Sequence, residues 1–400
     1  MNVFGALLFV VALIVSVVLH EAGHMVCARW AGGKVTEFFV GFGARIWSFR
    51  RGETEYGLKA IPAGGYVKIV GMTDLDEIEP GDEDRALKNK PARKRLLTLA
   101  AGSLVHFLIA LVLFFLSPML FGVNKADDSA RVGQVAGCLS DTGSTSCAAG
   151  VAQSPASKAG LVEGDVITKV GGTPVRTFQQ LADALHGLQA RQSSPLTYTD
   201  KQGVSHTTTV VPIHSDSVTD ATGKVTGGSL IGLAQASYNQ RYNPLSAAAY
   251  SGQQFGDGIV NTFKGLGSIP ASIPKLLSST VDHTQRSTNS PVGVVGMAQI
   301  SGSIIGEAGF AGFLALVALI NVFIGVFNLL PILPLDGGHV AILLYEEARK
   351  RVYRLLRRPA PGRVDLNKLI PVAYAFLLVF VGLTVLLLAA DITNPIRLPS

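Results

Sequence analysis

The pattern His20-Glu21-x-x-His24 places two metal-binding side chains and a carboxylate within one helical turn. On a helix, His20 and His24 lie on the same face, so both imidazoles can reach one Zn²⁺ ion. Glu21 then lies beside the ion, where its carboxylate can take a proton from water. The motif follows an uncharged stretch, Val3–Leu19, and ionisable groups at membrane depth are costly and usually functional. The alternative is a polar helix end that binds no metal.

A hydrolytic zinc site needs three protein ligands and one open position, so a third ligand must come from elsewhere in the chain. Asp336 is the candidate, because it follows the uncharged stretch 310–335, in which Pro331 and Pro334 prevent a regular helix. The alternative is an aspartate that ends a helix at the membrane surface. His339 is close enough in sequence to compete as a ligand, but we expect it to lie beside the site or exposed.

Composition predicts the elements that must position these residues. The 400 residues are 48% hydrophobic and 16% charged, whereas soluble domains carry about 25% charged residues. The apolar residues gather in four blocks, each long enough to cross a membrane if the first continues past Leu19. The net charge of +6 comes from basic residues beside these blocks, where they set topology, so nucleic-acid binding is not expected.

The distribution of Lys and Arg predicts which segments face the cytoplasm. Segment 29–95 holds 13 of the 34 and segment 341–368 holds 8, whereas the much longer segment 121–310 holds 12. Because basic residues concentrate on the cytoplasmic side, the N-terminus, the large insert and the C-terminal tail are expected outside. The first and third spans then run in the same direction, which brings Asp336 to the same membrane face as the two histidines.

The fold class that we predict is a polytopic α-helical membrane protein with four transmembrane helices, a cytoplasmic membrane-associated β-hairpin and one extracytoplasmic PDZ-like α/β domain. The expected segments are the first span 1–28, a cytoplasmic loop 29–95, the second span 96–123, the PDZ-like domain 124–236, a juxtamembrane segment 237–309, the third span 310–340, a basic cytoplasmic loop 341–368, the fourth span 369–390 and an outer tail 391–400.

Together, the motifs resemble those of the site-2 protease family, the intramembrane zinc metalloproteases. The resemblance rests on His20-Glu21-x-x-His24, on the stretch Asn328-x-x-Pro331-x-x-Pro334-Leu335-Asp336-Gly337, on the Gly-rich cytoplasmic loop and on the insert. It covers nearly the whole chain. Four spans with a single PDZ-like insert look most like the actinobacterial regulators of intramembrane proteolysis, whereas the enterobacterial members have two tandem PDZ domains.

The resemblance implies that His20, His24 and Asp336 bind zinc and that Glu21 is the catalytic base. It also implies a bacterial plasma membrane, with the active site near the cytoplasmic side. The implied substrates are single-pass membrane proteins, commonly anti-sigma factors. An upstream site-1 protease would already have trimmed the same substrate outside the membrane.

The cytoplasmic loop contains a predicted β-hairpin. Glu53–Ile61 alternates as a strand does, Pro62–Gly65 is typical of a turn, and Tyr66–Val70 is a second β-rich run. A hairpin beside the zinc could add an unwound substrate as an extra strand through backbone hydrogen bonds. The alternative is a hairpin with a structural role only.

Five residues are therefore candidates for substrate binding. Gly64, Gly65, Tyr66 and Val67 belong to the predicted hairpin. The fifth, Asn328, precedes the two prolines. Its amide could donate to a substrate carbonyl or satisfy backbone groups that the broken helix frees, and the sequence leaves both readings open.

The insert is expected to form short strands around one helix, over residues 132–233. The stretch Ser154–Ile167 resembles the helix-to-strand join of bacterial PDZ domains. Such a domain binds extended peptides at a sheet edge, often by their C-termini, or could reject untrimmed substrates by size. Cys138 and Cys147 lie here on the oxidising side, so we predict a disulfide between them, with two free thiols as the alternative.

Two other classes of function would use the same features. One is a membrane-anchored PDZ receptor without catalysis, in which Glu21 would be dispensable. The other is a metal-handling transporter, which would need a continuous polar path. The second and fourth spans contain no acidic or amide side chain, which disfavours the transporter.

Overall fold

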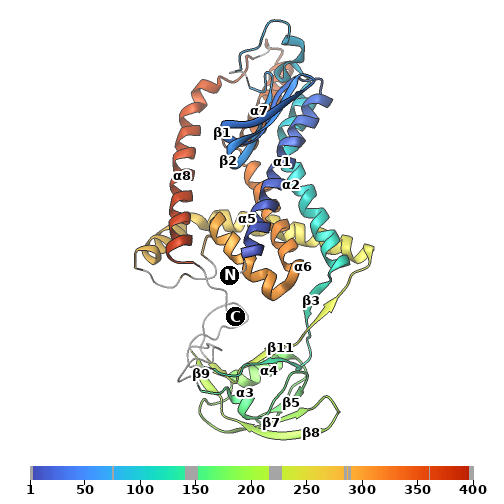
Figure 1. Cartoon of the computed structure of the whole chain (residues 1–400), viewed down its shortest axis with the longest axis vertical. Helices are drawn as coiled ribbons and strands as arrows, with labels where there is room; N and C mark the ends of the chain where they lie inside the picture. The colour runs from blue at the N-terminus through green and yellow to red at the C-terminus, as the bar shows by residue number, and fades with distance from the viewer. Residues whose placement is uncertain are drawn as a thin grey trace. The chain divides into compact units, whose positions relative to one another are not determined.

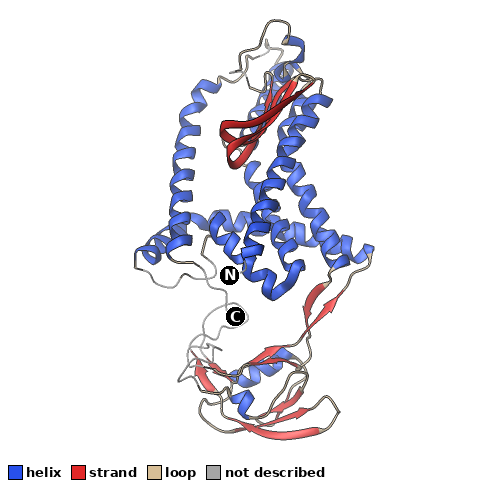
Figure 2. Ribbon diagram, in the orientation of Figure 1, coloured by secondary structure: helices blue, strands red, loops and turns tan. Residues whose placement is uncertain are grey.

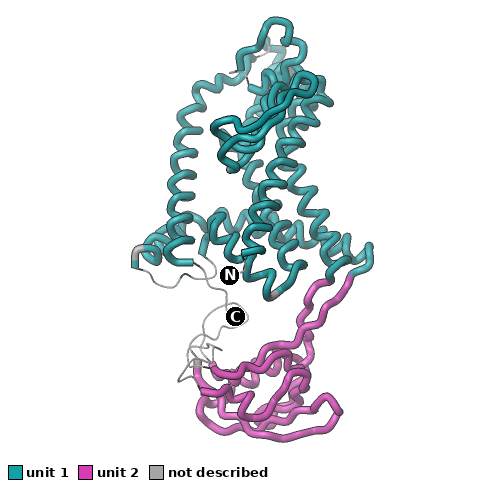
Figure 3. The backbone as a smooth tube through the Cα atoms, in the orientation of Figure 1, with its two compact units in different colours: residues 1–121, 242–399 teal, residues 122–241, 400 magenta. Residues whose placement is uncertain are grey.

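The computed structural model describes residues 3–73, 76–139, 152–215, 228–282, 286, 290–359 and 361–395. The chain forms two compact units, one of residues 1–121 with 242–399 and one of residues 122–241 (Figure 3). The first, here called the helical unit, holds the long helices and one pair of long strands (Figure 2). The second, here called the β-rich unit, holds the short strands.

The helical unit contains the segments that can cross a membrane. Within the described residues, four helical stretches are long and apolar enough to do so, and each has at least 21 residues, or about 30 Å of helix. Their number agrees with the four predicted spans, and they are Val3–Trp30, Ala92–Leu120, Ala308–Asn328 and Leu366–Thr393. The helices of this unit are α1 (Val3–Trp30), α2 (Ala92–Leu120), α5 (Pro244–Val281), α6 (Val294–Asn328), α7 (Asp336–Leu355) and α8 (Ile370–Thr393), with 3₁₀ turns at Glu83–Arg85, Leu87–Asn89 and Leu366–Leu369.

Helices α1, α2 and α6 pack closely because small residues let their backbones approach. Gly23 of α1 lies against the backbone of Ala101 in α2, where a Cβ atom would come within 3.0 Å of the carbonyl oxygen. Buried apolar side chains fill the space between α1 and α6, among them Phe9 and Phe313. This packing brings the C-terminal part of α1 alongside the first half of α2.

The third span ends earlier than predicted, and a separate helix follows it. The sequence placed 310–340 in one span and 341–368 in a loop, but α6 ends at Asn328 and α7 begins at Asp336. Gly337 permits this arrangement, because a Cβ atom there would collide with the backbone just after α6. The basic residues that follow are good helix formers and continue α7. The predicted break in the helix at the two prolines is confirmed.

The predicted hairpin exists, but its strands pair differently from the prediction. It consists of β1 (Val35–Arg51) and β2 (Thr54–Ile69), which pack along α1 (Figure 1). Both predicted strands belong to β2, and the predicted turn lies inside it. The register places Val40 opposite both Leu58 and Gly65, so the first half of β1 lies between the two halves of β2. The partner strand was missed because its polar and apolar residues do not alternate regularly.

The β-rich unit matches the predicted pattern of short strands around a helix. The core is built from buried apolar residues such as Ile167, Leu181 and Leu196. One sheet has the order β6-β5-β7-β8, and the remaining strands form two-stranded pairs. The elements are β3 (Val123–Ala126), β4 (Val132–Val135), α3 (Pro155–Lys158), β5 (Val166–Val170), β6 (Thr173–Pro174), α4 (Phe178–His186), β7 (Ser194–Thr199), β8 (Ser205–Val210), β9 (Ile213–Ser215), β10 (Gly228–Leu230), β11 (Leu233–Gln235) and β12 (Ser237–Gln240).

The C-terminal end of α8 is buried rather than part of a tail. The sequence placed Asp391 in the segment 391–400, yet its side chain is 1% exposed in the last turns of α8. It forms an ion pair with Arg286 at 3.1 Å and accepts the backbone N–H groups of Gly293 and Gly296 at the start of α6. Unpaired N–H groups at the start of a helix attract a carboxylate, which explains why the Asp391 side chain is buried there.

Candidate metal centre

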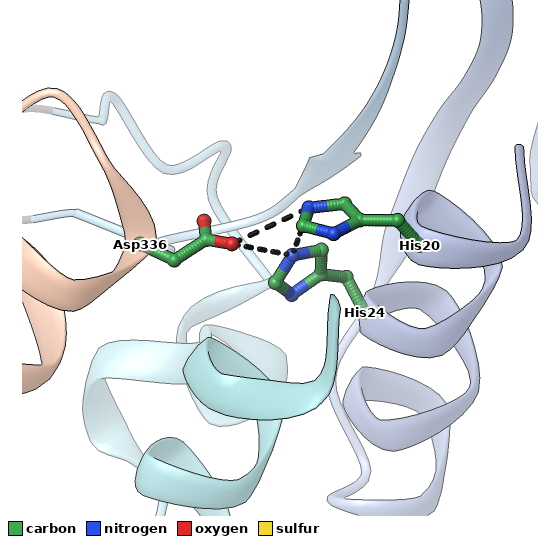
Figure 4. A group of neighbouring side chains, drawn as sticks. All are labelled: His20, His24 and Asp336. Carbon is green, nitrogen blue, oxygen red and sulfur yellow. Dashed lines mark hydrogen bonds and ion pairs between the residues drawn. The ribbon is translucent and has the colours of Figure 1, made fainter. Parts of the chain in front are cut away.

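His20 and His24 lie on one face of α1, as their spacing predicts (Figure 4). Their Nε2 atoms are 3.2 Å apart. Both residues are buried, with 7% and 3% of their surface exposed. A pair of imidazoles withdrawn from water in this way needs polar partners.

Asp336 supplies one of these partners from the first turn of α7. Its Oδ2 atom lies 3.3 Å from Nε2 of His20 and 3.2 Å from Nε2 of His24. The three side chains point toward one another from α1 and α7 (Figure 4). The fold therefore brings together residues that lie 312 positions apart in sequence.

Helix α2 contacts both imidazoles and fixes their orientation. Nδ1 of His24 lies 2.7 Å from the carbonyl oxygen of Thr98. Because a carbonyl only accepts, Nδ1 carries the hydrogen and Nε2 keeps its lone pair for the centre. Gly102 packs against the ring of His20, where a Cβ atom would come within 2.3 Å of Cε1.

The three ligand atoms fit a zinc ion. Zinc bonds to imidazole nitrogen and carboxylate oxygen are about 2.0–2.1 Å long, so neighbouring ligands of a tetrahedral ion lie about 3.3 Å apart. The three separations here are 3.2, 3.2 and 3.3 Å. The triangle thus has the size of one tetrahedral face, and two imidazoles with one carboxylate are a ligand set that zinc prefers. The ligand roles themselves stay a prediction.

Glu21 lies between the ligands on α1 and the strand β2. Its Cγ atom is 3.4 Å from the place where a Cβ atom of Gly65 would be. The backbone N–H group of Val67 lies close enough to the Glu21 carboxylate to act on its charge. The second half of β2 therefore runs directly alongside the predicted base.

The other predicted substrate-binding residues differ in their surroundings. The hydroxyl group of Tyr66 donates to Oε2 of Glu37 at 2.6 Å. Burial is the main cause that raises the pKa of Tyr66 above its usual value, and this hydrogen bond raises it further. Gly64 has a φ angle of 130°, a conformation that favours glycine. Asn328 is half-buried at the last position of α6.

Two further predictions concern residues away from the cluster. His339 is half-buried on α7 and lies outside the group of ligand atoms that the described residues form, in agreement with the expectation. The disulfide between Cys138 and Cys147 stays a prediction, because Cys147 lies outside the described residues.

A buried polar network next to His20 was not predicted from the sequence. His106 on α2 and Asn321 on α6 are each 1% exposed, and Nδ1 of His106 lies 2.7 Å from Oδ1 of Asn321. Asn321 also donates to the hydroxyl group of Ser16 on α1. The available signal was one histidine and one amide inside otherwise apolar spans, which are unusual at membrane depth.

The sequence matches the peptidase family M50 over residues 8–358. It is 35% identical over 408 residues to the zinc metalloprotease Rip1 of Mycobacterium tuberculosis, covering 100% of this chain and 99% of the relative. It is 30% identical to a putative zinc metalloprotease of Rhizobium meliloti, over 86% of this chain and 87% of the relative. Among solved structures, the PDZ domain of an SdrC-like protein from Listeria monocytogenes aligns with a TM-score of 0.18 and 18% identity, over 28% of this chain and 93% of that domain.

Proposed function

We propose that this chain, which belongs to peptidase family M50, cleaves single-pass membrane proteins within their transmembrane segments. Membership of this family makes it a membrane-embedded zinc metalloprotease. The observation that carries this proposal is the convergence of two buried imidazole nitrogens and one partly buried carboxylate oxygen at 3.2–3.3 Å beside Glu21. The site lies where the span α1 ends and the helix α7 begins. A peptide bond leaving the apolar part of a membrane would meet it there.

Each residue of the centre has a proposed role. His20, His24 and Asp336 would hold zinc, which when bound supplies a Lewis acid for the amide carbonyl and for water. Glu21 would accept the proton of the attacking water and return it to the leaving amine. The backbone N–H group of Val67, close to the Glu21 carboxylate, would help to hold that side chain in place for both transfers.

The second half of β2 is the proposed binding strand for the substrate. A transmembrane helix hides its amides in intrahelical hydrogen bonds, so it must unwind before cleavage. Within the described residues, the ladder pairs Gly65–Ile69 with β1 on one side, which leaves the other edge for an added strand. Gly64 and Gly65 leave room for a close backbone approach, and Tyr66 and Val67 continue the same edge. Asn328 would either donate to the substrate carbonyl or stabilise the end of α6.

The remaining proposals concern partners and sidedness. The clustering of basic residues supports a centre near the cytoplasmic face, with the N-terminus, β-rich unit and C-terminus outside. The similarity to bacterial zinc metalloproteases supports a bacterial plasma membrane. Anti-sigma factors, already trimmed outside the membrane by a site-1 protease, are the proposed substrates. The β-rich unit, PDZ-like by sequence, would bind their new C-termini or exclude untrimmed chains.

The test combines zinc analysis with cleavage by the purified full-length protein in detergent. The substrate would be a trimmed single-pass anti-sigma factor. We expect Glu21→Gln to keep its zinc and to lose about 10²–10⁴-fold in cleavage rate, because a general base is removed. We expect Asp336→Ala to lose zinc. The matched control is Glu53→Gln, at an exposed position of the hairpin turn.

Three outcomes would contradict the proposal. Unchanged cleavage by Glu21→Gln would remove Glu21 as the base. An unchanged zinc content in Asp336→Ala would remove Asp336 as a ligand. If wild-type protein bound zinc but cleaved no such substrate, a receptor without catalysis would be the better description.

A further inference from the structure

The two histidines of the candidate centre differ in how their second ring nitrogen is satisfied. Nδ1 of His24 donates to the carbonyl oxygen of Thr98. Nδ1 of His20 is buried and has no hydrogen-bond partner among the described residues. A histidine that binds a metal almost always donates its other N–H group, which fixes the ring and its tautomer. His20 therefore needs an acceptor that His24 already has.

The hydrogen bond between Asn321 and His106, next to His20, has a defined donor and acceptor. The amide nitrogen of Asn321 donates to the carbonyl oxygen of Val317 at 2.8 Å and to the hydroxyl group of Ser16 at 3.2 Å. Because the nitrogen serves these acceptors, the amide oxygen Oδ1 is the atom that meets His106. Oδ1 can only accept, so Nδ1 of His106 must be the donor.

This direction leaves His106 with a free acceptor. A buried imidazole is most stable in its neutral form, and with its hydrogen on Nδ1 it keeps a lone pair on Nε2. The ring of His106 lies 5.0 Å from the ring of His20, centre to centre. The lone pair on Nε2 of His106 and the buried Nδ1 of His20 thus belong to neighbouring rings.

We propose that His106, held by Asn321, is a positioning residue for His20. Nε2 of His106 accepts the N–H group at Nδ1 of His20 through one buried water, and so keeps the lone pair of His20 Nε2 directed at the metal. Gly102, one turn earlier on α2, has no side chain and so lets the ring of His20 lie close to this helix. The inference rests on the proposed metal site, and it adds to that site residues from α2 and α6 that touch neither metal nor substrate.

The test is the zinc affinity of the purified full-length protein, measured by competition with a chelator. We expect His106→Leu to weaken zinc binding by about 10–100-fold, the usual effect of removing a partner of a metal-binding histidine. His106→Gln should recover most of the affinity, because its amide oxygen again offers an acceptor. The matched control is Ser117→Ala, which removes a buried hydroxyl group eleven residues further along α2, about 16 Å away.

A merely structural role for His106 predicts a different pattern. It would lower the thermal stability of the metal-free protein while leaving zinc affinity unchanged, and that result would overturn the proposal. Asn321→Leu should weaken zinc binding as well. If the two residues act in one chain, the double variant with His106→Leu should lose less than the sum of the two losses; additive losses would remove Asn321 from the chain.

The same measurement separates this proposal from the metal site on which it rests. His24→Ala should abolish zinc binding if the site is correct. If His24→Ala binds zinc like the wild type, the metal site itself is wrong. If His24→Ala loses zinc and His106→Leu does not, the site stands and only the positioning role fails.

Discussion

Gly102 is the residue at which a single added methyl group tests the geometry of the metal centre. In Gly102→Ala the new Cβ atom would lie 2.3 Å from Cε1 of His20, a distance that real Cβ atoms do not adopt. Movement of α2 away from α1 would lose the close packing of Ala101 against Gly23 of α1. The His20 ring must turn instead, so we expect at least about tenfold weaker zinc binding by chelator competition.

The control for this prediction is Gly382→Ala on α8, where an added Cβ atom meets nothing within 4 Å. It should leave zinc affinity unchanged and slightly favour the helix. Wild-type zinc affinity in Gly102→Ala would mean that the His20 ring does not rest on α2 as described.

At this scale, the sequence is most informative where chemistry and spacing coincide. His20 and His24 could be predicted because four residues make one helical turn, and Asp336 because the direction of the spans brings it to the same membrane face. His106 could not, because its partner Asn321 lies 215 positions away and a single polar residue in an apolar span has no periodicity. Only the packing of α2 against α6 brings the two together.

At the scale of elements, β2 acts on the site through its backbone. Replacing Val67 by proline removes the N–H group that meets the Glu21 carboxylate. A hydrogen bond to a charged group contributes about 1.5–3 kcal/mol, so we expect cleavage to slow by about 10–100-fold while zinc stays bound. The measurements are the cleavage rate and the zinc content of the same preparation.

Val67→Leu is the matched control, because it keeps the N–H group and an apolar side chain. If Val67→Leu slows cleavage as much as Val67→Pro, the side chain rather than the backbone is responsible. Loss of zinc in the proline variant would instead indicate a wider disturbance of the site.

The hairpin also shows the limit of local patterns. The local pattern predicted strands over 53–61 and 66–70, and both segments lie in β2, but the turn predicted between them is wrong. Pairing also depends on which segment lies beside each strand. The partner, β1, has a poorer alternation and was not recognised. Pro62 and Gly65 are common in turns, yet here they lie within β2 as it passes from one side of β1 to the other, and Gly65 serves the approach to Glu21.

At the scale of the whole molecule, one buried ion pair joins segments that the sequence places far apart. Asp391 at the end of α8 and Arg286 before α6 are 105 positions apart and almost fully buried. The sequence predicted an outer tail here, because an acid after an apolar span usually faces water. Long-range pairing of this kind leaves no local pattern in either segment.

Because this ion pair is buried, we expect the loss of one member to lower the free energy of unfolding more than the replacement of both. Asp391→Leu would leave the Arg286 charge buried without its partner, which typically costs about 3–5 kcal/mol of folding free energy. Replacing both residues by apolar ones, in Asp391→Leu with Arg286→Met, should restore part of that loss. Full recovery is not expected, because Gly293 and Gly296 would still lose the carboxylate that accepts their N–H groups. Thermal unfolding of the detergent-purified protein measures both effects, and a double variant as unstable as the single one would show that the buried charge is not the cause.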